Sequence, residues 1–256
     1  MYVQQISIPF PKKPDEEFFR TVDLLMNFYR GSGQSLGRIH IEYLEKNSIV
    51  ALHHAHERNS FSSKYNSFYV NRELERLKNN YAITPVFSVA GKASPGKNYV
   101  CKCVSRDFMI LTTNYISIGS PVICGSCTNS VPLYKLPVYD DYGYMPILSW
   151  ESNYQSCDRL QMNCEVGERF GLNQLELIDS QLSKQGREIC ARLEVLTETP
   201  VYYYLHNYTK RRGTPESILC PGCGKKWHLK NLLCEEYNFM CKHCRIVSIE
   251  SPYSRS

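Results

Sequence analysis

The chain has 256 residues, of which 43% are hydrophobic and 21% charged, so we expect a soluble globular protein of one to three domains. No run of about 18 apolar residues occurs, which excludes a membrane-spanning helix of ordinary length. The net charge of +5 comes from the C-terminal fifth, because residues 206–256 hold nine lysines and arginines against four acids. A local basic excess of this kind favours a polyanionic partner.

The N-terminal residues show no basic region followed by an apolar stretch, so we expect no secretory signal and a cytoplasmic location. In a reducing cytoplasm the twelve cysteines would not form a disulfide framework. Their spacing then has to reflect metal binding, redox chemistry or burial.

Residues 1–92 predict an α+β domain. Strands are expected at 2–9, 38–43, 49–53 and 84–90, and helices at 15–30 and 70–77. The first helix would bury one face, made by Phe18, Val22, Leu25 and Tyr29. The resulting order β-α-β-β-α-β is that of a ferredoxin-like unit.

Three further segments follow, which gives an α+β fold class for the whole chain. Residues 98–148 form a first cysteine module of short strands and turns. Residues 149–205 predict a helix from Trp150 to about Glu168, a helix from Ser180 to Leu196 and a strand at 201–205. Residues 213–250 predict a C-terminal zinc ribbon. Cys157, Cys164 and Cys190 lie on the predicted helices among apolar neighbours, which favours core packing.

The strongest motif pairs Cys220 and Cys223 with Cys241 and Cys244. Two residues between paired cysteines let one turn aim both thiolates at one ion, and a hairpin of about 15–20 residues brings the second pair opposite. Gly224 would supply the positive φ that closes such a turn. Cys234, His228 and His243 lie nearby as possible substitute ligands, and buried cysteines without metal are the alternative interpretation.

A second candidate site combines Cys101 and Cys103 with Cys124 and Cys127. The pair Cys124–Cys127 has the usual spacing, whereas one residue separates Cys101 from Cys103. We therefore expect two zinc ions, with the C-terminal site as the minimum. Two alternatives stay open: the first pair lies on one face of a strand, or Cys124 and Cys127 form a redox motif.

Other chemical signals are weaker. His54 and His56 share one face of a predicted strand, which suggests either a metal pair or a solvated strand end. No nucleotide-binding glycine loop, nucleophile elbow or metalloprotease motif occurs, so we expect a protein that is not an enzyme.

Several strings together carry a family resemblance. They are Ser120–Cys127, Val131–Pro137, Cys157–Cys164, Pro200–Leu205 and Cys220–Gly224. With them the chain resembles an uncharacterised bacterial family of zinc-ribbon-containing proteins with a suggested role in nucleic-acid binding. The resemblance covers residues 98–250. It implies a bacterial cytoplasmic protein with at least one zinc ribbon, and zinc ligands at the eight paired cysteines.

The basic C-terminus predicts nucleic-acid binding as the first functional hypothesis. The expected contacts are phosphates for the lysines and arginines and a base for the tryptophan: Lys210, Arg211, Arg212, Lys225, Lys226, Trp227 and Lys230. In the alternative interpretation, Trp227 packs under the zinc site and the lysines are only solvated. The second hypothesis is a cytoplasmic protein-binding inhibitor, for example an immunity protein that neutralises a bacterial toxin.

Overall fold

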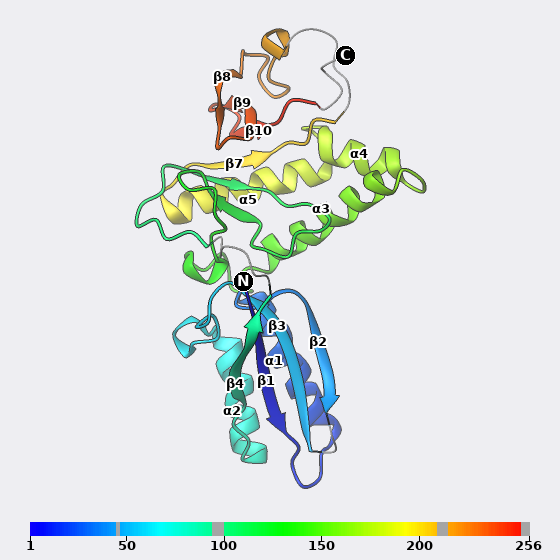
Figure 1. Cartoon of the computed structure of the whole chain (residues 1–256), viewed down its shortest axis with the longest axis vertical. Helices are drawn as coiled ribbons and strands as arrows, with labels where there is room; N and C mark the ends of the chain where they lie inside the picture. Colours follow the sequence, from blue (N-terminus) through cyan, green and yellow to red (C-terminus); the bar gives the residue numbers. More distant parts are fainter. Residues whose placement is uncertain (45–46, 94–99, 209–214, 252–256) are drawn as a thin grey trace. The chain divides into compact units, whose positions relative to one another are not determined.

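The computed structural model describes residues 1–44, 47–93, 100–208 and 215–251 (Figure 1). The predicted contacts Lys210, Arg211 and Arg212 lie outside these ranges. The chain divides into two compact units. Unit 1 contains residues 1–100, 118–120 and 131–145, and unit 2 contains residues 101–117, 121–130 and 146–256.

Unit 1 is a four-stranded sheet with two helices, and its element order is the one that the sequence predicts. The elements are β1 (Tyr2–Pro9), α1 (Glu16–Gly31), β2 (Leu36–Leu44), β3 (Ser48–Ala55), α2 (Phe68–Tyr81) and β4 (Val86–Lys92). The strands pair antiparallel in the order β2-β3-β1-β4. Both helices cover the same face of the sheet (Figure 1).

The predicted apolar face of α1 forms the core of unit 1. Phe18, Val22, Leu25 and Tyr29 are all at most 1% exposed and pack on Ile6 and other sheet residues. The helix begins where the Asp15 carboxylate accepts a hydrogen bond of 2.8 Å from the backbone N–H of Phe18, which satisfies one of the free donors of the first turn. Periodicity and capping therefore agree on this helix.

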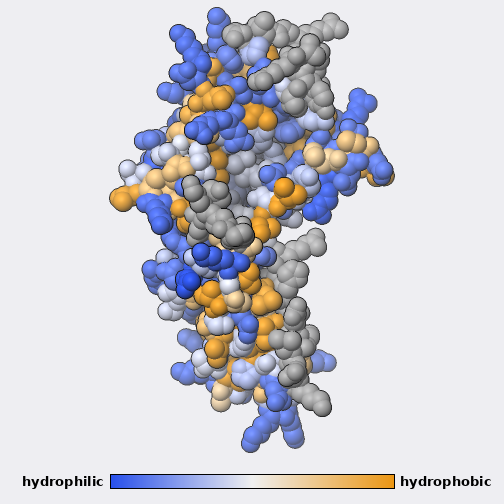
Figure 2. Space-filling view, in the orientation of Figure 1, coloured by the Kyte–Doolittle hydropathy of each residue, from blue (hydrophilic) through white to orange (hydrophobic). Residues whose placement is uncertain are grey.

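The other face of the sheet carries exposed apolar residues. Val86 pairs with Ser7 on β1, whose neighbours Ile6 and Ile8 are buried toward the helices. Because side chains alternate along a strand, Val86 lies on the opposite face, where it is 61% exposed. Figure 2 shows hydrophobic residues gathered on this face of the sheet.

Residues 131–145 belong to unit 1, whereas the sequence predicts them as part of the first cysteine module. Glu57 connects them to the N-terminal elements. Its Oε2 atom accepts a hydrogen bond of 2.9 Å from the Tyr134 hydroxyl and forms an ion pair of 2.6 Å with Lys135 Nζ. The Tyr134 hydroxyl also lies 2.9 Å from the Ser60 hydroxyl. This polar network fixes a distant segment of the chain to the loop that follows β3.

Unit 2 is built on a six-stranded sheet in the order β6-β5-β7-β10-β9-β8. The central strands β5, β7 and β10 run parallel, and the outer ones pair antiparallel. The sheet joins the predicted first cysteine module, the strand at 201–205 and the predicted ribbon. Its elements are β5 (Met109–Leu111), β6 (Val122–Cys124), β7 (Val201–Tyr204), β8 (His228–Leu233), β9 (Tyr237–Cys241) and β10 (Ile246–Ser248).

Three helices accompany this sheet: α3 (Met145–Asn163), α4 (Glu168–Glu176) and α5 (Gln181–Thr197). α5 packs closely on β7 at Gly186. A Cβ atom added at this glycine would lie 2.3 Å from the Tyr203 ring, so a larger residue would not fit without movement. The Trp150 indole of α3 is fully buried in the same region, with its ring centroid 6.0 Å from that of Tyr203. The fold class is therefore mixed α+β, and no described helix is long and apolar enough to cross a membrane.

The predicted helix from Trp150 to Glu168 is wrong at its C-terminal end. α3 stops at Asn163, because Cys164 adopts a positive φ of 53° and Gly167 one of 78° before α4 begins. The same break corrects the prediction for Cys164, which is exposed rather than packed in a core. Cys157 and Cys190 are buried as predicted.

Candidate metal centres

The structure brings the eight predicted ligands together as two separate groups of four thiols. Cys101, Cys103, Cys124 and Cys127 form the first tetrad, and Cys220, Cys223, Cys241 and Cys244 form the second. Within each tetrad the sulfur atoms lie within 4.8 Å of one another. Four sulfurs around one Zn²⁺ at about 2.3 Å would be separated by about 3.8 Å, so each tetrad could hold a metal ion with little adjustment.

The second tetrad consists of two tight turns. In the first turn, the N–H of Gly224 donates to the carbonyl of Cys220 at 2.8 Å, and the N–H of Cys220 donates to the carbonyl of Lys225 at 2.9 Å. In the second, the N–H of Cys244 donates to Cys241 Sγ at 3.4 Å. The Sγ atoms of Cys223 and Cys241 are 3.6 Å apart. Local hydrogen bonds therefore position the four thiols in the two turns that flank the β8–β9 hairpin.

The first tetrad contains one turn of the same kind. The N–H of Thr128 donates to the carbonyl of Cys124 at 2.8 Å, which closes the turn around Cys124 and Cys127. Cys101 and Cys103 lie instead in a segment without regular structure, tied to the turn by the N–H of Cys101, which donates to the carbonyl of Ser130 at 2.8 Å. The chain that leads from them to β5 also contacts this turn, because the Ser126 hydroxyl donates to the Asp107 carboxylate at 3.0 Å and the N–H of Gly125 donates to the Phe108 carbonyl at 2.9 Å.

All three turns place the residue after the second cysteine in the left-handed region. Thr128, Gly224 and Arg245 have φ values of 58°, 69° and 53°. The positive φ predicted at Gly224 is thus confirmed. Thr128 and Arg245 adopt the same conformation at a steric cost, which indicates that surrounding contacts hold them there.

One thiol in each tetrad has a lowered pKa. Burial acts to raise the pKa of Cys101, but hydrogen bonds from the Cys103 backbone and the Arg106 guanidinium bring this pKa down to about 7. The backbone N–H of Lys225 lowers the pKa of Cys223. A thiolate is the form of cysteine that binds a metal, so both tetrads have a thiol favoured in that form.

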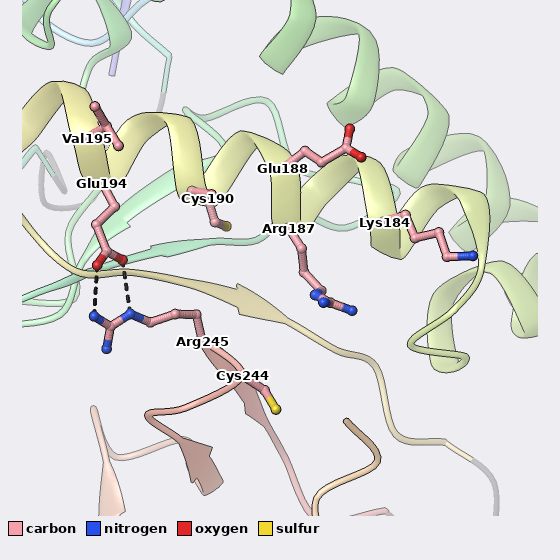
Figure 3. Close-up of a pocket in the computed structure, with 9 residues that line it drawn as sticks. Lys184, Arg187, Glu188, Cys190, Glu194, Val195, Cys244 and Arg245 are labelled. Atoms are coloured by element: carbon pink, nitrogen blue, oxygen red, sulfur yellow. Dashed lines mark hydrogen bonds and ion pairs between the residues drawn. The ribbon is translucent and has the colours of Figure 1, made fainter. Parts of the chain in front are cut away.

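Arg245 fixes the second tetrad to α5. Its Nη2 and Nε atoms donate to the two carboxylate oxygens of Glu194 at 2.7 and 3.0 Å (Figure 3). This paired geometry is the strong form of an arginine–carboxylate contact. On the other turn, a Cβ atom at Gly222 would lie 2.8 Å from Cys244 Sγ and 2.9 Å from the Ile178 side chain. Glycine at this position therefore allows the two turns and the loop before α5 to approach closely.

Cys234 lies beside the first tetrad, not within the second. It occupies the turn between β8 and β9, where its Sγ atom donates to the carbonyl of Gly125 at 3.3 Å. Gly125 stands between two ligands of the first tetrad, so this contact joins the two cysteine regions. Sequence spacing could not reveal it, because 109 residues separate the partners.

The other candidate ligands belong to neither tetrad. Within the described part of the chain, no group of three or more metal-binding side chains includes His54, His56, His228 or His243. His56 is buried at 3% exposure, so the alternative of a solvated strand end does not hold for it.

The predicted nucleic-acid contacts divide into exposed and buried residues. Lys225, Lys226 and Lys230 are exposed. Trp227 is only 4% exposed, and its ring centroid lies 4.9 Å from that of Phe239. The indole is therefore packed against β9 and is not placed to stack on a base, in agreement with the alternative in which Trp227 packs inward.

The fold and these sites define a mixed α+β protein with two tetracysteine centres. Three consecutive parts of the chain match families that are each described as a domain of unknown function: residues 1–91 (DUF8589), 103–206 (DUF2310) and 211–253 (DUF8594). No solved structure matches the chain.

Two uncharacterised proteins of Haemophilus influenzae are similar to the chain. One is 29% identical over 234 residues, which cover 90% of this chain and 89% of the relative. The other is 34% identical over 145 residues, which cover 56% of this chain and 71% of the relative. The chain belongs to the same bacterial family as this second relative.

Proposed function

We propose that this protein is a non-catalytic, cytoplasmic zinc protein that binds nucleic acid through the basic end of its C-terminal ribbon. The donor chemistry supports zinc, because four thiolates in a tetrahedral arrangement select Zn²⁺ or iron–sulfur clusters. All four positions would be filled by protein ligands, so neither ion would have an open position for a substrate. Both zinc ions would then stabilise structure, and the second tetrad with β8, β9 and β10 would be a zinc ribbon.

The remaining architecture agrees with a binding protein. The strand order β2-β3-β1-β4 with two helices on one face supports a ferredoxin-like fold for unit 1. In that fold the uncovered sheet face is available for contacts, but fold alone does not assign a partner.

The observation that carries the proposal is the separation of charge along the ribbon. Lys225, Lys226 and Lys242 are exposed on the two turns that hold the second tetrad. At the other end of the β8–β9 hairpin, Glu235 and Glu236 lie with Glu250 around one hollow. A polyanion would therefore approach the cysteine end, where phosphates meet lysines, and would be repelled at the hairpin turn.

The test is a titration of the zinc-loaded full chain with labelled single- and double-stranded DNA and RNA at several salt concentrations. We expect affinity to fall with salt, because each neutralised phosphate releases counterions. Replacing Lys225, Lys226 and Lys242 by alanine should lower both the affinity and the salt slope, by about 0.7–0.9 slope units for each lost contact.

The matched control replaces Glu235 and Glu236 by glutamine at the other end of the hairpin, which should leave binding unchanged or strengthen it. Absence of binding to every nucleic acid at about 50 mM salt would contradict the proposal, because non-specific electrostatic binding is strongest at low salt. That result would favour the protein-binding alternative, such as an immunity protein.

A further inference from the structure

A cavity of about 520 Å³ lies between α5 and the second tetrad. Its walls include Cys244 from the tetrad and Cys190, Ala191 and Val195 from α5. The ion pair of Arg245 with Glu194 closes one side (Figure 3). The cavity has the size of a small-ligand site and combines apolar and charged walls.

Two cations of α5 line this cavity. Lys184 and Arg187 are three residues apart, so they lie on neighbouring turns of the same helical face. Arg187 Nη1 donates to the Ile178 carbonyl at 3.5 Å, which positions the guanidinium. Among the residues that the structure describes, neither cation forms an ion pair, in contrast to Arg245. Figure 3 shows Arg187 extending to the side of α5 where Cys244 lies, whereas Glu188 points away from it.

The cavity lining holds three cations, Lys184, Arg187 and Arg245, against the two carboxylates of Glu188 and Glu194. Four thiolates and one Zn²⁺ carry a net charge of about −2. Outside the lining, the exposed Lys225, Lys226 and Lys242 on the two cysteine turns carry a charge of +3, which exceeds that of the metal centre. The Arg245 charge is already balanced by Glu194. For the lining, the metal centre and the two cysteine turns together, the positive charges therefore exceed the negative ones by two.

We propose that this cavity binds a phosphate group, with Lys184 and Arg187 as its direct contacts. The inference rests on the proposed function, since a nucleic-acid strand on the cysteine turns would supply the phosphate. The guanidinium can donate two parallel hydrogen bonds to phosphate oxygens, and the lysine adds a point charge. Helix α5 thereby becomes part of the nucleic-acid site, although it lies outside the basic C-terminal fifth of the chain.

The experiment compares the zinc-loaded full chain with the double variant Lys184→Ala/Arg187→Ala, using a fluorescein-labelled single-stranded oligonucleotide. We expect the variant to bind about tenfold more weakly, with a salt slope smaller by about 1.4 units for two lost phosphate contacts on a single strand. Arg192→Ala is the matched control, because Arg192 is exposed on the same helix and does not line the cavity. It should bind like the wild type.

In the variant Glu188→Gln we expect the affinity for the oligonucleotide to rise instead of fall. Although its side chain points away from Cys244, Glu188 lies next to Arg187 at the cavity, so removing its negative charge should strengthen oligonucleotide binding severalfold, which a folding defect would not produce. Zinc content and thermal unfolding of each variant show whether the second tetrad is intact.

The outcomes separate this inference from the proposed function. If the oligonucleotide binds, loses affinity in the Lys225/Lys226/Lys242 variant and binds the α5 variant normally, the cavity proposal is overturned and the proposed function stands. If no oligonucleotide binds, titration with AMP and inorganic phosphate tests whether the cavity still binds a phosphate group. Binding of either by the wild type and not by the α5 variant would support the phosphate site with a small-molecule source. Absence of all binding would overturn both proposals.

Discussion

The two tetracysteine centres use the same ligands but differ in how the chain supports them. The second tetrad has two tight turns joined by one hairpin: backbone hydrogen bonds close the first, and the N–H of Cys244 donates to Cys241 Sγ in the second. The first has one such turn and a segment without regular structure that carries Cys101 and Cys103. Local turns therefore position all four ligands of the second centre but only two ligands of the first.

The centres also differ in their position in the sheet. Cys241 is the last residue of β9, and β10 begins two residues after Cys244. Both strands are interior, and β10 pairs with the central strand β7. Cys124 is the last residue of β6, which is an outer strand. A metal in the second tetrad would thus hold interior strands, whereas a metal in the first would hold an edge.

The largest expected effect is the loss of the second metal through Cys220→Ser. Zinc-binding energies of about 10–16 kcal/mol act as folding energy in sites of this type. Because β10 lies between β9 and β7, we expect hydrogen-exchange protection to be lost in β8, β9 and β10 and to fall in β7. Cys164→Ser is the control, since that thiol is exposed and belongs to neither tetrad. Unchanged protection of β8, β9 and β10 in Cys220→Ser would contradict a structural role of the metal.

A smaller effect is expected from Cys103→Ser in the first tetrad. Elemental analysis should show a fall from two zinc ions per chain to one, and hydrogen exchange should change at β5 and β6 while β9 and β10 remain protected. This local response follows from the edge position of β6. Loss of both metals in this variant would show that the two centres depend on each other, which the Cys234–Gly125 contact makes structurally reasonable.

Gly125→Ala tests the steric demand of the first turn. An added Cβ atom would lie 2.2 Å from the Phe108 ring, so the ring or the turn has to move. We expect a loss of about 1–3 kcal/mol of unfolding free energy, as for other overpacked sites. Urea unfolding measures it, and the double variant with Phe108→Leu should recover part of the loss. An effect below about 0.5 kcal/mol would mean that the turn adjusts freely.

Gly224→Ala tests the backbone demand of the second turn without a steric one. Nothing lies within 4 Å of the added Cβ atom, but φ is 69°. The expected cost is about 1 kcal/mol, which is the penalty of the left-handed region for a residue with a side chain. Gly91→Ala provides the control, because its Cβ atom also meets nothing and no positive φ is required there. An equal loss of unfolding free energy in Gly224→Ala and Gly91→Ala would show that the positive φ of Gly224 is not the cause.

The smallest effect is expected at the ion pair that anchors the second centre. Arg245 lowers the pKa of Glu194, so the pair stabilises the fold above the pKa of the unfolded carboxyl and loses this contribution as pH falls through the folded pKa. Both side chains are about one third exposed, so Glu194→Gln should cost only about 0.5–1 kcal/mol at neutral pH. Denaturant unfolding across the acidic range should show a weaker pH dependence in the variant. The same pH dependence of the unfolding free energy in variant and wild type would show that the ion pair of Arg245 with Glu194 does not stabilise the fold.

Much of the candidate site could be predicted from the sequence. Spacing alone paired Cys220 with Cys223 and Cys241 with Cys244, because two intervening residues define a tight turn whatever surrounds it. Apolar periodicity likewise placed the buried face of α1. These features depend on contacts within a few residues, which local sequence specifies.

Only the tertiary structure decided how these local pieces combine. The parallel pairing of β7 with β10 joins segments more than forty residues apart, and the contact of Cys234 with Gly125 spans 109. The sequence allowed Trp227 either to stack on a base or to pack inward. In the structure it is buried, because it packs on Phe239. The physical reason is that pairing and burial depend on which surfaces meet, and residue type and spacing do not specify those partners.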